Sequence, residues 1–116
     1  MRAIRGAISV ATNTSQAIDE ATHELLDVLT HRNDLRPEDI ISVFFTLTPD
    51  LNAAFPARAA RAFGWDVPML DMQEVDVPDA LQRCLRVLIH VQSDGPARHA
   101  YLREAQTLRP DLEEQP

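Results

Sequence analysis

Arg86 lies within an apolar run, residues 84–91, that is short enough to be a buried strand. A permanently charged guanidinium in such a run needs an anionic partner. The first strand candidate repeats the arrangement, because Arg5 alternates with Ile4 and Ile8 near the N-terminus. Arg presents a planar fork that binds a carboxylate through two hydrogen bonds. Two strand-borne arginines therefore predict a site for a small carboxylate ligand.

Composition limits the possible partners. The 116-residue chain has 11 basic side chains, all arginine, against 18 acidic ones, which gives a formal net charge of -7. A field of this sign repels polyanions and argues against nucleic acid as a partner. The absence of lysine has two explanations that stay open, a need for planar carboxylate clamps and codon bias.

The same composition predicts a cytoplasmic setting. A single cysteine excludes an intrachain disulfide, and the start of the chain lacks the pattern of a secretory signal. No apolar run approaches the length of a membrane span, so we expect no membrane partner.

Hydrophobic periodicity places the two arginines in an α+β domain. Residues 3–10 and 84–92 alternate with period two, so that each strand has one apolar face and one face carrying an arginine. The other expected elements are a long helix after the capping residues 12–15, a helical turn at 36–39, a strand at 41–48, a short helix at 57–63 between Pro56 and Gly64, and a strand at 67–72. In the strand at 41–48, we expect Ile41, Val43, Phe45 and Leu47 to point inward. The segment 99–108 is ambiguous by periodicity.

One long and one short helix over one face of a mixed sheet leave the second face without a cover. A chain this small covers that face most economically by packing against copies of itself, so we expect a homo-oligomer. We expect residues 1–112 to form one domain and residues 113–116 to form a flexible C-terminal tail.

Six motifs occur in one order over nearly the whole chain: RGA at 5–7, TPDLNAAFPARAAR at 48–61, MQEVDV at 72–77, CLRV at 84–87, HAYL at 99–102 and LRPDL at 108–112. Together they resemble the small monofunctional chorismate mutases of the trimeric pseudo-α/β-barrel class, not the all-helical class. The resemblance implies a homotrimer with sites at the subunit interfaces and a dianionic small-molecule substrate. It also implies conversion of chorismate to prephenate in phenylalanine and tyrosine biosynthesis, on the shikimate pathway.

That reaction is a unimolecular Claisen rearrangement, which requires no proton transfer, metal or cofactor. It requires the dianion in a compact conformer and positive charge beside the ether oxygen. By the resemblance, Arg86 faces that oxygen, Arg5 binds a carboxylate and Glu74 accepts a hydrogen bond from the substrate hydroxyl. The implied substrate-binding residues are Tyr101, which reaches a carboxylate, and the positions at the mouth, rim and closing segment: Phe55, Ala57, Arg58, Arg61, Leu70, Asp71, Leu108 and Arg109.

Taken singly, these residues also have structural interpretations, such as an ion pair for Arg86 and a packing role for Tyr101. Asp71 departs from the family pattern, in which a small polar residue such as Cys is common. Its carboxylate either accepts the substrate hydroxyl or repels the dianion, and if it shares a pocket with Glu74, their repulsion raises one pKa. We expect Cys84 to be a small buried hydrophobe and not a nucleophile.

Two other function classes remain open on the sequence alone. A non-catalytic trimeric module that binds small carboxylates would use the same pair of arginines. A deaminase of the trimeric small-ligand class would also anchor a carboxylate with a strand arginine, but the sequence identifies no base for it.

Overall fold

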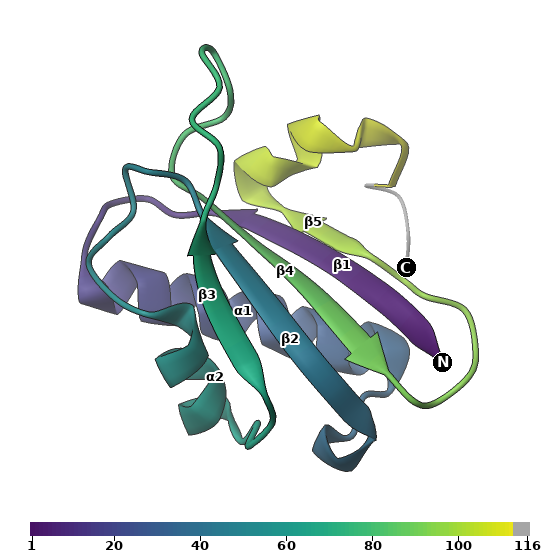
Figure 1. The fold of residues 1–116 in the computed structure, drawn as a ribbon. Helices are drawn as coiled ribbons and strands as arrows, with labels where there is room; N and C mark the ends of the chain where they lie inside the picture. The colour runs from purple at the N-terminus through teal and green to yellow at the C-terminus, as the bar shows by residue number, and fades with distance from the viewer. Residues whose placement is uncertain (113–116) are drawn as a thin grey trace.

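The computed structural model describes residues 1–112, and it has the α+β class expected from the sequence (Figure 1). The tail predicted for residues 113–116 lies outside the described residues. In chain order the elements are β1 (Arg2–Ser9), α1 (Ser15–Asn33), the 3-10 turn η1 (Pro37–Asp39), β2 (Ile40–Leu47), α2 (Pro56–Phe63), β3 (Met69–Gln73), β4 (Cys84–Val91), β5 (Ala100–Leu102), and the 3-10 segments η2 (Arg103–Leu108) and η3 (Pro110–Leu112). None of the helices in this part of the chain is long and apolar enough to cross a membrane.

The five strands form one mixed sheet in the order β3-β2-β4-β1-β5. β4 is antiparallel to both β1 and β2, whereas β3 pairs with β2 and β5 pairs with β1 in parallel. The two strands with arginines in their sequence pattern, β1 and β4, are therefore neighbours near the centre of the sheet.

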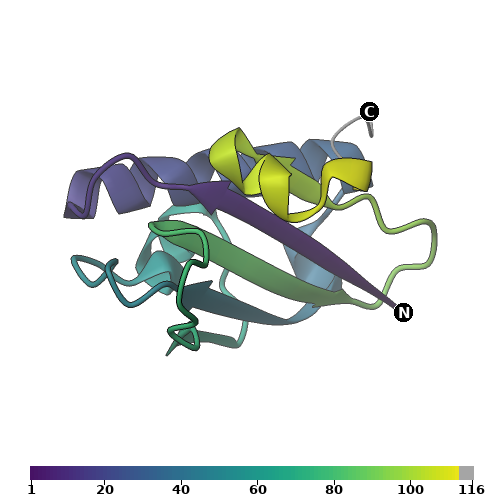
Figure 2. The same ribbon diagram turned by 90° about the horizontal axis from the view of Figure 1, so that it is seen from above.

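The core lies between one face of this sheet and the helices, and α1 runs along that face (Figure 2). Ile4 and Ile8 of β1 and Ile89 of β4 are fully buried there, as their period-two spacing predicts. Gly6 lets α1 approach closely, because a Cβ at this position would lie 2.8 Å from the Leu29 side chain.

Both helices begin where the sequence indicates, and α2 also ends there. The Thr14 hydroxyl accepts the Ala17 N–H at 3.1 Å and caps α1. Pro56 occupies the first turn of α2, and Gly64 ends that helix with φ 115°. This φ strains any residue with a Cβ, so glycine is required there.

Strands β3 and β2 each differ from the sequence expectation. β3 begins at Met69 and not at residue 67, because Pro68 has no N–H to donate to the ladder. In β2, the register shifts between Ile40 and Ser42. This irregularity puts Ile40 in the core, whereas Ile41 is only half-buried, so the inward orientation expected for Ile41 is wrong.

The ambiguous segment 99–108 resolves into the short strand β5 and the 3-10 segment η2. Ala105 of η2 packs with Tyr101, Ala7 and Cys84 in a small second core, on the face of the sheet away from the helices. One corner of the second sheet face is thus covered by the chain's own C-terminal segment. The rest of that face is open.

Candidate active site

The strand register places Arg5 and Arg86 on the open face of the sheet. Ala7 pairs with Arg86 and Leu88 pairs with Arg5. The two arginines are therefore diagonal neighbours, whose Cα atoms lie about 7 to 8 Å apart in such a pair of strands. Beyond Arg86, the same row continues to Thr46 on β2. The face opposite the helices therefore carries two cations on rigid central strands.

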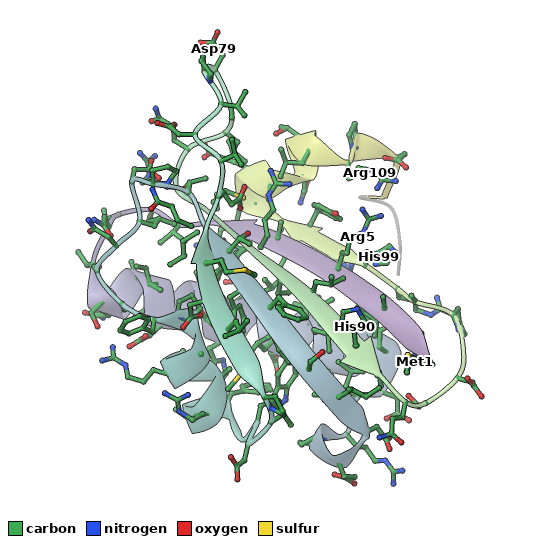
Figure 3. The ribbon with its side chains drawn as sticks, in the orientation of Figure 1. Met1, Arg5, Asp79, His90, His99 and Arg109 are labelled. Atoms are coloured by element: carbon green, nitrogen blue, oxygen red, sulfur yellow. The ribbon has the colours of Figure 1, made fainter. Side chains whose placement is uncertain are left out.

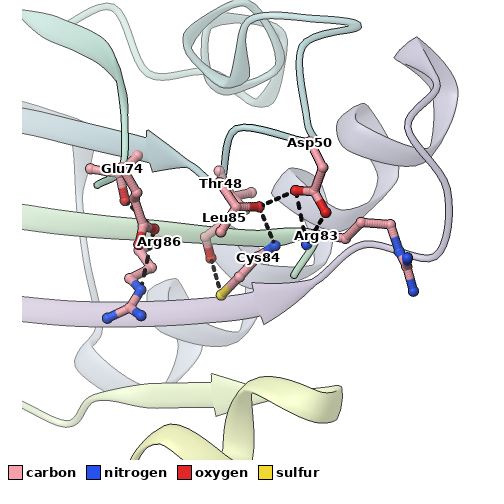
Figure 4. A network of polar contacts seen from close by, with 8 residues as sticks. Thr48, Asp50, Glu74, Arg83, Cys84, Leu85 and Arg86 are labelled. Carbon is pink, nitrogen blue, oxygen red and sulfur yellow. Dashed lines mark hydrogen bonds and ion pairs between the residues drawn. The ribbon is translucent and has the colours of Figure 1, made fainter. Parts of the chain in front are cut away.

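Arg86 forms an ion pair with Glu74, which follows directly after β3. The Arg86 Nε lies 3.2 Å from a Glu74 carboxylate oxygen (Figure 4). The Thr46 hydroxyl donates to the same oxygen at 2.7 Å. The Glu74 N–H donates to the Leu47 carbonyl at 2.8 Å, which fixes the start of this segment. The ion pair that was the structural alternative for Arg86 is present, and its partner Glu74 is another residue to which the resemblance assigns a catalytic role.

The start of β4 is held against the end of β2 by a second polar network (Figure 4). The Thr48 hydroxyl accepts the Cys84 N–H at 2.9 Å and donates to Asp50 at 2.6 Å. The Asp50 carboxylate accepts the Arg83 N–H at 3.0 and 3.1 Å. These bonds fix the backbone two residues before Arg86.

A cavity of about 340 Å³ opens on this face, with Arg5, Arg86 and Tyr101 in its wall beside Thr46 and apolar side chains. Within residues 1–112, the Arg5 side chain makes no ion pair or side-chain hydrogen bond. A small hollow with two guanidinium groups and a phenol suits an anionic ligand.

The C-terminal segment lies near two residues of the cavity wall. Leu108 packs against the small core that contains Tyr101, and Arg109 pairs with Asp111 at 2.9 Å. Figure 3 shows Arg109 close to Arg5 and His99. Leu108 and Arg109 are thus neighbours of Tyr101 and Arg5, but neither lines the cavity itself.

His99 takes part in this arrangement, although no role is expected for it from the sequence. Its Nδ1 accepts the Arg5 N–H at 2.9 Å, just before β5 begins to pair with β1. Burial lowers the pKa of His99, and the Arg5 and Arg109 charges lower it further. The imidazole is therefore neutral at pH 7, as an acceptor must be.

A second cavity, of about 550 Å³, lies at the start of α2 and includes Phe55, Arg58 and Asp71 in its wall. Phe55 is 68% exposed. The Arg58 Nη2 donates to the Ser15 hydroxyl at 3.0 Å and lies 3.7 Å from the Asp19 carboxylate. Both of these partners belong to the first turns of α1.

Asp71 belongs to this second cavity because of its position on β3. One of its carboxylate oxygens accepts the Ala57 N–H at 3.1 Å, in the first turn of α2. An anion is favourable at a helix N-terminus. Burial raises the pKa of Asp71, while this N–H and the nearby Arg61 charge oppose the rise.

Asp71 and Glu74 therefore do not share a pocket. Asp71 pairs with the buried Phe45, on the helix side of the sheet, whereas Leu70 pairs with Phe44 on the open face. Glu74 is not among the causes of the raised Asp71 pKa, so the repulsion considered from the sequence is not its origin. Leu70 lines neither cavity.

The residues selected from the sequence thus form two groups within one chain. The sheet half-site consists of Arg5, Glu74, Arg86, Tyr101, Leu108 and Arg109. The helix half-site consists of Phe55, Ala57, Arg58, Arg61 and Asp71. Met72 lines both cavities, so β3 forms the wall between them.

Cys84 lies beside Arg86 but is fully buried. Burial raises the pKa of its thiol to about 11, although the neighbouring Arg86 charge opposes the rise. The thiol is therefore protonated at pH 7, in agreement with its interpretation as a small buried hydrophobe.

Comparison with known proteins identifies the family. The family model "Chorismate mutase type I" matches residues 1–112. The chain belongs to this family. It is 44% identical to Chorismate mutase AroH of Bacillus subtilis (strain 168), over 97% of this chain and 92% of the relative. It is 49% identical to Chorismate mutase AroH of Thermus thermophilus, over 97% of each chain.

The fold agrees with a solved chorismate mutase from Clostridium thermocellum, with a TM-score of 0.89 and 44% identity over 92% of this chain and 99% of that one. The resemblance inferred from the sequence motifs is confirmed. The chain is a chorismate mutase, an isomerase of aromatic amino acid biosynthesis that converts chorismate to prephenate.

Sequence reasoning missed three residues at the candidate site: Thr46, Met72 and His99. A signal existed for Thr46, because period two in residues 41–48 puts it on the face opposite the apolar one. Met72 and His99 begin the motifs at 72–77 and 99–102, but their contacts at the site depend on how separate segments pack together.

Proposed function

We propose that the chain rearranges chorismate at a composite site, in which the sheet half-site of one subunit faces the helix half-site of another. The observation that carries this proposal is the pairing of Arg86 with Glu74 beside the cavity that Arg5 and Tyr101 line. Arg86 thus carries a permanent positive charge on a rigid strand, and its ion pair with Glu74 fixes the orientation of the guanidinium in the wall of this cavity.

In this proposal, Arg86 stabilises the charge that develops on the ether oxygen as the C–O bond breaks and the new C–C bond forms. A donor that is already oriented stabilises this charge without reorganising during the reaction. Glu74, held by Thr46 and Arg86, accepts the substrate hydroxyl. Arg5 and Tyr101 bind a carboxylate and hold the compact conformer.

The helix half-site encloses the substrate from the other side. The exposed ring of Phe55 shields the cyclohexadiene, and Arg58 and Arg61 attract the dianion to the mouth. Leu108 and Arg109, already at the edge of the sheet half-site, close over the bound ligand. No residue in this scheme gives or takes a proton.

The proposed assembly is a homotrimer that closes a pseudo-α/β barrel. Support comes from the exposed apolar side chains Phe55, Leu70, Met72, Val75 and Val77. They belong to the edge strand β3, to the loop that projects between β3 and β4 (Figure 1), and to the residue before α2. Exposed large apolar side chains that gather on neighbouring elements are typical of a subunit interface. A cytoplasmic location remains a prediction.

The first experiment incubates the purified chain with chorismate and follows the loss of diene absorbance, with prephenate identified as the product. Turnover is expected. Saturable binding of chorismate without turnover would instead support the carboxylate-binding module.

The composite site is tested by mixing two variants, Arg86→Ala and Phe55→Asp, each of which disables one half-site. After subunit exchange at equal amounts, about one quarter of sites combine two intact halves, because each half comes from either variant with equal chance. Sedimentation should give three times 13.0 kDa. Recovery of no activity from confirmed mixed trimers would show that each site lies within one chain.

A further inference from the structure

The segment that carries Phe55 is held by few contacts of its own. Leu51 before it and Pro56 after it are buried, but residues 52, 53 and 55 are exposed. Because the Phe55 ring itself is exposed, its position depends on the backbone of residues 52–55. What fixes this backbone therefore fixes one wall of the helix half-site.

Asn13 supplies these contacts from the loop before α1. Its Oδ1 accepts the N–H groups of Asn52 and Ala53 at 3.0 and 3.1 Å, and its Nδ2 donates to the Asn52 side-chain oxygen at 2.8 Å. No other hydrogen bond to these two N–H groups occurs within residues 1–112. One side chain thus satisfies two consecutive backbone donors 39 and 40 residues away.

The anchor is itself rigid. Asn13 directly precedes Thr14, whose hydroxyl caps α1, and α1 packs on the sheet through fully buried side chains. Two residues further on, Ser15 holds the Arg58 guanidinium. The start of α1 therefore contacts both Phe55's loop and Arg58.

We infer that Asn13 is a positioning residue for the helix half-site, which acts by holding residues 52–55 and hence Phe55 in the orientation that receives substrate. The inference rests on the proposed function, in which Phe55 covers the bound ring. Without the Asn13 side chain, the two N–H groups form hydrogen bonds with water instead, and residues 52–55 become mobile. Substrate binding must then order this loop, which costs conformational entropy. This cost falls on binding, because the reacting atoms face Arg86 on the other half-site.

The test compares Asn13→Ala and Asn13→Asp in the full-length protein, with Gln16→Ala as a control at a residue that makes no hydrogen bond with Asn13. Since one net hydrogen bond is worth about a factor of 2 to 12 in an equilibrium constant, Asn13→Ala should raise KM about tenfold and change kcat by less than about twofold. Asn13→Asp keeps an oxygen acceptor for both N–H groups, so its KM should stay close to that of the unaltered protein. Gln16→Ala removes an amide that bonds only Glu20 on the same helix, and should leave KM unchanged.

A double-mutant cycle shows whether Asn13 acts through Phe55. Adding Asn13→Ala to Phe55→Ala should raise KM much less than it does in the unaltered protein, because the side chain being positioned is already gone. Equal effects in both backgrounds, or an unchanged KM in Asn13→Ala alone, would overturn the inference.

Amide hydrogen exchange in the ligand-free protein separates this inference from the proposed function. Asn13→Ala should abolish protection of the Asn52 and Ala53 amides, and unchanged protection refutes the positioning role whatever the kinetics. Asn13→Ala could abolish this protection while Phe55→Ala leaves kcat and KM unchanged. In that case the assignment of Phe55 to the site is wrong, but Asn13 still fixes the backbone of residues 52–55.

Discussion

Replacing Arg86 with citrulline separates the charge of this residue from its geometry. Citrulline keeps the Nε–H group that lies 3.2 Å from Glu74, so the side chain retains its anchor, but it is neutral. If Arg86 stabilises charge on the ether oxygen, the variant should bind substrate nearly as well and turn it over far more slowly.

The structure sets the size of the two effects. The Arg86 side chain is 45% exposed, and an ion pair of this kind contributes less than about 1 kcal/mol to folding stability. Loss of one oriented donor to a developing oxyanion costs about 2.7 to 4 kcal/mol, a factor of about 100 to 1000 in rate. The expected loss of turnover therefore exceeds anything that partial unfolding explains.

Initial rates from diene absorbance give kcat and KM, and thermal unfolding of the same samples controls for stability. We expect kcat to fall at least about a hundredfold, with KM changed only slightly. A variant that keeps kcat and loses only affinity would make Arg86 a binding clamp, and the catalytic assignment would be wrong.

Three further predictions concern Asp71, Cys84 and Arg58. Because the pKa of Asp71 is raised in the folded protein, the free energy of unfolding falls as the pH rises from 3.8, the ordinary pKa of this group, through the raised pKa. Asp71→Asn keeps an acceptor for the Ala57 N–H and cannot ionise, so it should stabilise the fold above the raised pKa. Urea unfolding across mildly acidic pH should therefore be flatter for Asp71→Asn, and equal slopes would argue against a raised pKa. Cys84, with a pKa of about 11, should react with a thiol reagent at pH 7 only as fast as the chain unfolds; rapid labelling of folded protein would contradict its burial. Arg58→Ala should raise KM and weaken its salt dependence. Asp19→Asn removes the carboxylate 3.7 Å from Arg58 and should lower KM by less than about fivefold. Steady-state kinetics at two salt concentrations test both, and a lower kcat in Arg58→Ala would place that residue at the reacting atoms.

Period two predicted the central strands because each has one face against the helices and one face open. In β4, Ile89 is buried and Arg86 is exposed on alternate sides, so the sequence carries the alternation directly. β5 could not be found this way, since three residues, Ala100–Leu102, are too few to show a period. The register shift at Ile40 in β2 is a property of strand pairing and leaves no mark on hydropathy.

The candidate site was predictable as a set of residues, but not as an arrangement. The family resemblance selects both Asp71 and Glu74, which are only three residues apart in the sequence. Their separation into two cavities follows from pairing: Asp71 points to the helix side with Phe45, and Glu74 lies beyond the end of β3, where it meets Arg86. Similarly, Asn13 and Asn52 are distant in sequence, and only the packing of α1 brings them into contact.

Charge balance links the two half-sites to the substrate. The chain carries a net charge of -7, so its long-range field disfavours a dianion, and attraction must come from cations within a few ångströms of the ligand. Within residues 1–112, Arg5 of the sheet half-site and Arg61 of the helix half-site form no ion pair, whereas Arg58 and Arg86 each contact a carboxylate. In the proposed trimer, Arg5 and Arg61 belong to one composite site, and two substrate carboxylates supply counter-charges for them. Substrate binding then stabilises the subunit interface as well as the reacting conformer, because the same ligand neutralises cations from both chains.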